Sequence, residues 1–332
     1  MKSLMKRVLY RSGLLTLAGL ARRRAGALVL RYHAVTDGDD VLYATPEICM
    51  PVAAFRLQMA FVKRAYTVLP LDALAQAIRR GETLPARPLA ITFDDGYADN
   101  HRLAFPVLDR LGLTATLYVT TGSLEDGPPL WMSAVRALVF RARGPELAVP
   151  GLPPIGLAPR VDRAAAARAL TRALVPLDAT TRAERLASAA AMAGVDLGQA
   201  LAGIMLRWDD VRTLARAGWT IGAHTVTHAN VALAKAADAE AEIATSRDAI
   251  AAVIGAKVVH FAYPNSGGEH RYFGDGVTDI LRRLGFETAV TSRAGLLRAG
   301  ADPYALPRIG VSPRLAPVSE LAAALARQRL AA

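Results

Sequence analysis

Short runs rich in Val, Ile and Leu alternate from residue 27 onward with segments of helical periodicity. The expected strands cover residues 27–32, 67–69, 89–93, 115–119, 220–223, 260–262, 288–291 and 309–311. Between two of them, Phe55, Met59, Val62 and Tyr66 recur at the spacing of one helix face. This alternation predicts an α/β fold with a mainly parallel sheet, and seven or eight strands suit a closed barrel.

One segment interrupts the alternation. Residues 131–207 are rich in Ala, Leu and Arg, contain a Pro/Gly stretch at 145–159, and offer no expected strand. We therefore predict a helical insertion within a barrel that spans residues 27–330. Loops at the carboxyl ends of barrel strands build active sites, so the insertion could cap a substrate groove. A purely structural appendage is the alternative.

The net charge of +11 is concentrated at the amino-terminal end. Residues 1–36 hold no acid and eight basic residues, which leaves only +3 for the rest of the chain and gives no support for nucleic-acid binding. The apolar run there ends in Arg22-Arg23-Arg24 without a cleavage site and is shorter than the roughly 20 residues of a membrane span. We predict a basic amphipathic helix over residues 1–26, either in peripheral contact with an anionic membrane surface or packed on the body. The expected location is cytoplasmic or peripheral on the inner membrane.

The strand at 89–93 ends abruptly in Asp94, Asp95 and Gly96. Adjacent carboxylates repel each other unless a cation or a proton compensates them, so the pair indicates a metal with one acid left to act as a base. A solvated turn with a capping aspartate is the bland alternative.

Two histidines, His224 and His228, follow the strand at 220–223 and lie four residues apart. On a helical turn, residues at this spacing share a face, so both imidazoles are expected to reach one ion. A lone pair of this kind is a weak signal. Together with Asp95 it supplies two nitrogens and one oxygen and leaves positions open, as in catalytic metal sites.

The segments Thr92-Phe93-Asp94-Asp95-Gly96-Tyr97 and His224-Thr225-Val226-Thr227-His228 resemble the first two motifs of the polysaccharide deacetylase family. Three further segments resemble the branch related to poly-N-acetylglucosamine deacetylases. They are Arg31-Tyr32-His33, Phe261-Ala262-Tyr263-Pro264 and Leu306-Pro307-Arg308-Ile309. The resemblance runs from about residue 27 to residue 312.

The resemblance implies a distorted (β/α)7 barrel that binds a divalent ion, commonly zinc, and removes an acyl group from an N-acylated saccharide. The implied ligands are Asp95, His224 and His228, and Asp94 is implied as the base that accepts a proton from the attacking water. A backbone N–H in the segment 263–265 is expected to stabilise the oxyanion. The implied substrate-binding residues are Tyr97, Tyr263, Pro264 and Asn265.

The chain departs from the usual family pattern where the general acid should lie, because no Leu-x-His motif follows His270. We predict His33 as the acid, since it follows the first strand and lies in a motif that resembles an active-site element. A histidine satisfied by the backbone is the alternative. Arg308 is expected to orient Asp94 or the substrate, with a surface ion pair as the alternative, and Trp131 to stack on a sugar ring.

Two other functions stay open at this point. The same site could hydrolyse another C–N bond, such as a formamide on a lipid-linked sugar or a cyclic amide. The chain could also be an inactive carbohydrate-binding protein, although binding alone does not need all four of Asp94, Asp95, His224 and His228.

Overall fold

The computed structural model describes residues 26–38, 41–125, 127–158, 162–265 and 270–331. The predicted basic helix at residues 1–26 lies almost entirely outside these ranges, so the helix and its membrane contact stay predictions. Within the described part of the chain, no helix is long and apolar enough to cross a membrane.

Seven parallel strands form one curled sheet in the order β11-β10-β9-β6-β5-β1-β12. They are β1 (Leu28–Tyr32), β5 (Pro88–Phe93), β6 (Thr116–Val119), β9 (Thr220–Ala223), β10 (His260–Ala262), β11 (Thr288–Val290) and β12 (Ile309–Gly310), and β4 (Thr67–Val68) adds to the edge of β5. All eight predicted strands are present.

The two ends of this sheet approach each other through irregular chain. The backbone of Leu306 and Arg308, just before β12, bonds to Ala289, Thr291 and Arg293 in and after β11, with N···O distances of 2.8–3.0 Å. The sheet therefore curls into the distorted barrel that the sequence predicted.

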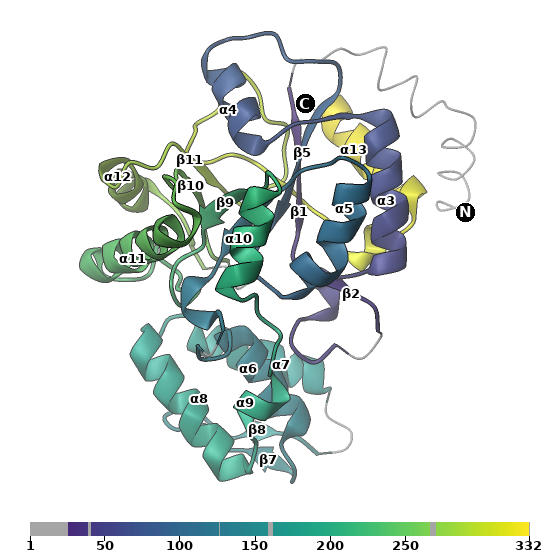
Figure 1. Cartoon of the computed structure of the whole chain (residues 1–332). Coiled ribbons are helices and arrows are strands. Elements are labelled where there is room, and N and C mark those ends of the chain that lie inside the picture. The colour runs from purple at the N-terminus through teal and green to yellow at the C-terminus, as the bar shows by residue number, and fades with distance from the viewer. Residues whose placement is uncertain (1–25, 39–40, 126, 159–161, 266–269, 332) are drawn as a thin grey trace.

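Helices cover the outside of the sheet (Figure 1). These are α3 (Val52–Ala65), α4 (Leu71–Arg79), α5 (Phe105–Arg110), α10 (Trp208–Arg216), α11 (Ala236–Ile254), α12 (Asp275–Arg283) and α13 (Val318–Ala331). Short elements fill the connections: β2 (Ala34–Thr36), β3 (Cys49–Pro51), and the single turns η1 (Pro46–Ile48), η2 (Asn100–Ala104), η3 (Thr121–Ser123) and η4 (Pro313–Leu315).

Strand alternation decides which side chains enter the barrel. In β1, Leu28, Leu30 and Tyr32 join the core under the outer helices, whereas Val29 packs with Ala90 of β5 in a second apolar cluster inside the barrel. Because side chains alternate along a strand, Arg31 and Asp94 belong to the same side as Val29 and Ala90. The barrel is apolar at its amino end and charged at its carboxyl end.

Residues 131–207 follow β6 and lie beyond the carboxyl ends of the strands (Figure 1). They contain α6 (Trp131–Arg141), α7 (Arg163–Leu174), α8 (Ala179–Ala193) and α9 (Leu197–Ala200) around a separate apolar core. The sequence offered no strand here, but β7 (Glu146–Leu147) and β8 (Ile155–Gly156) form a short antiparallel hairpin. The Pro/Gly-rich stretch hid it because turn residues dominate so short a pairing.

Candidate metal and catalytic site

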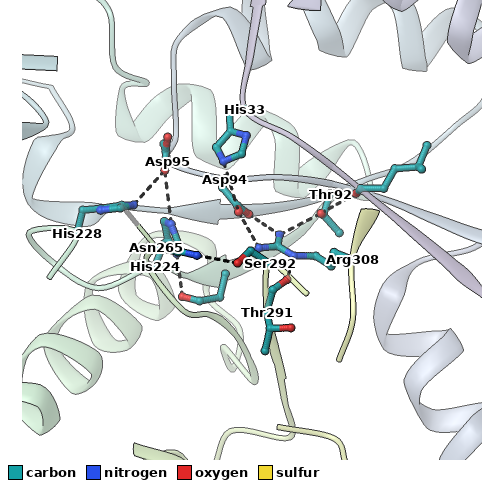
Figure 2. A network of polar contacts seen from close by, with 12 residues as sticks. His33, Thr92, Asp94, Asp95, His224, His228, Asn265, Thr291, Ser292 and Arg308 are labelled. Atoms are coloured by element: carbon teal, nitrogen blue, oxygen red, sulfur yellow. Dashed lines mark hydrogen bonds and ion pairs between the residues drawn. The ribbon is translucent and has the colours of Figure 1, made fainter. Parts of the chain in front are cut away.

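Asp95, His224 and His228 meet in one buried pocket at the carboxyl ends of β5 and β9 (Figure 2). The Nε2 atoms of His224 and His228 lie 3.5 and 3.4 Å from the same carboxylate oxygen of Asp95, Oδ1. Each of the three side chains is about 2% exposed. The structure thus brings together all three residues that the family resemblance implied as ligands.

The donor set fits a small divalent ion. Ligand atoms about 2.0–2.2 Å from a tetrahedral zinc lie roughly 3.3 Å apart, close to the spacing between the carboxylate and the two imidazoles. The Nδ1 of His224 lies 2.8 Å from the carbonyl oxygen of Ala262, so Nδ1 carries the proton and Nε2 presents its lone pair. The Oδ2 of Asp95 is buried without a hydrogen-bond partner in the described part of the chain.

The protonation states also suit an ion. Burial lowers the pKa of His228 below its ordinary value, which favours the neutral imidazole that a metal requires. Burial alone would raise the pKa of Asp95, but His224 and His228 beside it hold that pKa well below its usual range. At neutral pH the site presents the Asp95 carboxylate and the neutral imidazole of His228.

The histidine segment is not the helical turn that the sequence analysis expected. Residues 224–228 form a loop in which Thr225 and His228 have positive φ angles of 63° and 55°. Both imidazoles reach the same carboxylate oxygen of Asp95, although the backbone that the sequence analysis assumed was wrong. Two left-handed residues, instead of one helical turn, direct both rings to Asp95.

Glu242 of α11 fixes this loop, and sequence analysis did not single it out. Its Oε2 accepts hydrogen bonds from the backbone N–H groups of Val226 and Thr227 at 2.8 and 2.9 Å, and its Oε1 accepts one from the Thr227 hydroxyl at 2.6 Å. A lone glutamate on an amphipathic helix gives no sequence signal for such a role. A carboxylate that receives three donors from one loop holds its backbone in place.

Trp131 supports the same loop from the insertion. We expected Trp131 to stack on a sugar ring, and the structure shows that this is wrong. The side chain is 7% exposed and lies in the core of the insertion. The guanidinium of Arg182 covers its ring, 4.6 Å from the ring centroid. Its Nε1 lies 3.3 Å from the carbonyl oxygen of His228 and donates to it. Burial of a large aromatic side chain stabilises the core through its apolar area, and its N–H then finds one hydrogen-bond partner.

Asp94 and Arg308 form a buried, bidentate ion pair beside the candidate metal site (Figure 2). The distances from the guanidinium nitrogens to Asp94 Oδ1 and Oδ2 are 2.6 and 2.7 Å, and Arg308 is 1% exposed. Arg308 also donates to the Thr291 carbonyl and the Thr92 hydroxyl. The surface ion pair considered for Arg308 is excluded, and its guanidinium orients Asp94.

Burial alone would raise the pKa of Asp94, but the guanidinium of Arg308 holds it at about 2. Its carboxylate is therefore charged throughout the neutral range. His33 faces it, with Nε2 3.9 Å from Asp94 Oδ2, and burial lowers the pKa of His33 to about 4. His33 is thus neutral at rest, and its ring points to the site as predicted.

A cavity of about 490 Å³ opens over these groups. Tyr97, Tyr263 and Asn265 lie on its wall, whereas Pro264 is not among the residues that line it. The Tyr263 hydroxyl donates to the carbonyl oxygen of Tyr304. The backbone N–H of Tyr263 donates to the carbonyl oxygen of Val290 at 3.2 Å. Since proline has no N–H, Asn265 is the remaining candidate in the segment 263–265, and an oxyanion donor there stays a prediction.

Asp99 supports the wall of the cavity through Tyr43 and was also missed. It accepts hydrogen bonds from the Val35 backbone at 3.0 Å and from the hydroxyl of Tyr43, a wall residue, at 2.6 Å. Burial raises its pKa to about 7. Its position two residues after the Tyr97 motif was the only available hint.

The curled parallel sheet and the acidic and histidine groups at its carboxyl end define an α/β barrel with a candidate metal site. A family model described as polysaccharide deacetylase matches residues 81–142 and 178–289, more than half of the 332 residues. The chain belongs to the polysaccharide deacetylase family, whose members are hydrolases that act on carbon–nitrogen bonds.

Relatives support this assignment at the level of the fold. YxkH of Bacillus subtilis, described as a polysaccharide deacetylase, is 27% identical to this chain over 97 residues. These residues cover 29% of this chain and 32% of that protein. The chain thus matches only about a third of this curated relative. The Streptococcus pyogenes deacetylase PplD, solved with acetate, superposes with a TM-score of 0.61 at 18% identity over 90% of this chain and 97% of that one. IcaB from Ammonifex degensii gives 0.58 at 19% identity, with the same two coverages.

Proposed function

We propose that this chain is a metal-dependent hydrolase that removes an N-acetyl or related acyl group from an amino sugar in a polysaccharide or glycoconjugate. One observation carries the proposal: two buried imidazoles share one carboxylate oxygen of Asp95 at the spacing of metal ligands, next to a cavity large enough for a sugar. Membership of the deacetylase family supports the reaction class.

Asp95, His224 and His228 would hold the ion, for which zinc is our choice because two imidazoles and a carboxylate are common catalytic zinc ligands. Such an ion supplies Lewis acidity and lowers the pKa of water toward about 7. This contribution matters for Asp94, because a carboxylate whose pKa is about 2 is a weak base for ordinary water.

Asp94 then accepts the proton of the attacking water, with Arg308 holding both of its oxygens in a fixed orientation. The departing nitrogen must leave as an amine, so a second group has to protonate it. We assign this step to His33, which faces Asp94 across 3.9 Å. Because its pKa of about 4 makes it neutral at rest, His33 must first take over from Asp94 the proton of the attacking water, and it then passes this proton to the departing nitrogen.

The test combines metal analysis with product release. Purified protein should contain about one divalent ion per chain, release acetate from a panel of N-acetylglucosamine oligomers, lose activity with a chelator and regain it with zinc. Asp95→Asn should lose both ion and activity. Metal-free protein with full activity refutes the proposal, and release of formate from N-formyl sugars without acetate release assigns the site to a deformylase instead.

A further inference from the structure

The cavity over the metal site has two walls of different origin. The inner wall comes from the barrel mouth and holds Arg31, Asp94 and Asp95, and the outer wall includes α7 of the segment 131–207. Helix α7 contributes Arg168, Thr171 and Arg172 to the lining. Residues three and four apart lie on one face of a helix, so these three side chains form a single polar strip.

Positive charge dominates this cavity. Four arginines and three acids line it among the described residues. Two of the acids are already committed, because Asp94 is held by Arg308 and Asp95 lies between the imidazoles. The third acid, Glu47, is exposed. A divalent ion at Asp95 would make the cavity more positive still.

Arg31 is the arginine of the inner wall. Its Nε is buried without a hydrogen-bond partner, and it forms no ion pair with any residue in the described ranges. Burial lowers the pKa of Arg31 and the charge of Arg308 adds to this effect, whereas Asp94 and Asp95 partly offset it. An anion in the cavity would add to that compensation.

Arg168 and Arg172 project from α7 with exposed side chains. Arg168 lies 3.5 Å from Asp162, but both side chains are more than half exposed, so this ion pair contributes little and is easily exchanged. Arg172 makes no ion pair within the described part of the chain. With the hydroxyl of Thr171 between them, two guanidiniums present donors in the arrangement that binds phosphate and carboxylate groups.

We propose that this cavity selects an N-acylated sugar bearing a phosphoryl or carboxylate group, which Arg168 and Arg172 bind at the outer wall while Arg31 adds positive potential at the inner wall. This proposal names the substrate class and rests on the proposed function of the metal site. A neutral sugar would offer no counter-charge to Arg31, Arg168 and Arg172.

The product of the reaction leads to the same conclusion. Hydrolysis of each N-acyl group liberates an amine that takes up a proton near neutral pH. A neutral polymer would become a polycation as it is processed, and like charges would drive it from a cavity lined by arginines. A substrate with its own anionic group gives a zwitterionic product, which these arginines tolerate.

Binding of sugars without an amide tests the subsite separately from catalysis. The probes are methyl glucoside, glucose 1-phosphate and glucuronic acid, titrated calorimetrically into the full-length protein at low and at high salt. We expect one or both anionic sugars to bind at least about tenfold more tightly than the glucoside, with a preference that weakens as salt rises. Glucose 1-phosphate alone would identify the phosphoryl group, and glucuronic acid alone the carboxylate.

The double variant Arg168→Gln/Arg172→Gln should lose about tenfold in affinity for the anionic probe and leave the glucoside unchanged. The control is Arg141→Gln at the exposed end of α6, which does not line the cavity. Equal affinities for the neutral and anionic probes, or equal losses in the control, overturn the proposal. Since no probe contains an amide, the subsite is decided even if the acetate-release assay fails.

Discussion

The clearest quantitative expectation concerns Glu242, which fixes the histidine loop without touching the metal site. Thr225 and His228 hold left-handed conformations that cost about 1–3 kcal/mol each for residues with a Cβ. Three hydrogen bonds to the Glu242 carboxylate help to offset this cost. Without them, the loop is expected to relax in the metal-free protein, and an ion has to restore it on binding.

The size of the effect follows from those three contacts. Hydrogen bonds to a charged group contribute about 1.5–3 kcal/mol each when buried. Glu242 is half-buried and water can replace part of each bond, so we take about 1 kcal/mol each, or about 3 kcal/mol in all. Since each 1.4 kcal/mol corresponds to a factor of ten, a loss of about 3 kcal/mol predicts that Glu242→Ala weakens zinc binding by about 100-fold, the upper end of the range found for groups that support metal ligands. Glu242→Gln keeps the shape and can still accept from the loop, so it should lose less than about tenfold.

The assay is competition for zinc against a chromophoric chelator, with thermal unfolding as a check that each variant folds. Glu240→Ala is the matched control, because Glu240 lies on the same helix but pairs with Arg283 on the surface. It should leave zinc affinity unchanged. The reasoning fails if Glu242→Ala and Glu240→Ala bind zinc equally well, or if the loss in Glu242→Ala is matched by Glu242→Gln.

Three further expectations follow from the buried charges. Asp94→Asn should keep its metal but lose about 10²- to 10⁴-fold in hydrolysis, and should unfold at lower temperature because Arg308 loses its counter-charge; near-normal turnover would reassign the base. His33→Gln should retain metal and slow hydrolysis of an amide more than that of an activated ester, and equal losses would argue against the acid role. Asp99 has its folded pKa raised to about 7 from 3.8, so its stabilising contribution is complete below about pH 4 and is lost as pH rises toward 7. The unfolding temperature of Asp99→Asn relative to the native chain should therefore rise between pH 5 and pH 8, and a pH-independent difference would contradict this.

The fold was predictable because its signals are local. Short apolar runs around Leu30 and Ile91, separated by segments of helical periodicity, indicate the buried strands of a parallel sheet. The meeting of Asp95 and His224 was predictable for a related reason, since each lies within two residues of a strand end. The carboxyl ends of parallel strands lie at one edge of the sheet, which brings these side chains together. His228 depends in addition on the loop that follows His224.

The supporting contacts were not predictable because they join residues that are far apart in the sequence. Trp131 lies 97 residues from the carbonyl of His228 to which it donates, and only the packed structure shows that its ring is covered. The same limit explains the wrong backbone for residues 224–228. Spacing alone favours a helical turn, whereas anchors on Thr227 from α11 and on His228 from α6 stabilise a left-handed loop.

The segment 131–207 acts on the candidate site in two distinct ways. Trp131, at the start of α6, contacts the backbone of the metal loop, and Arg182 of α8 packs over its ring. Arg168 and Arg172 of α7 face the cavity instead. A change on the face of α7 can therefore alter the charge offered to a substrate without moving a metal ligand, whereas a change at Trp131 or Arg182 acts on the loop that presents His228. If both proposals hold, variants of α7 should change KM with little effect on zinc affinity, and variants at Trp131 should do the reverse.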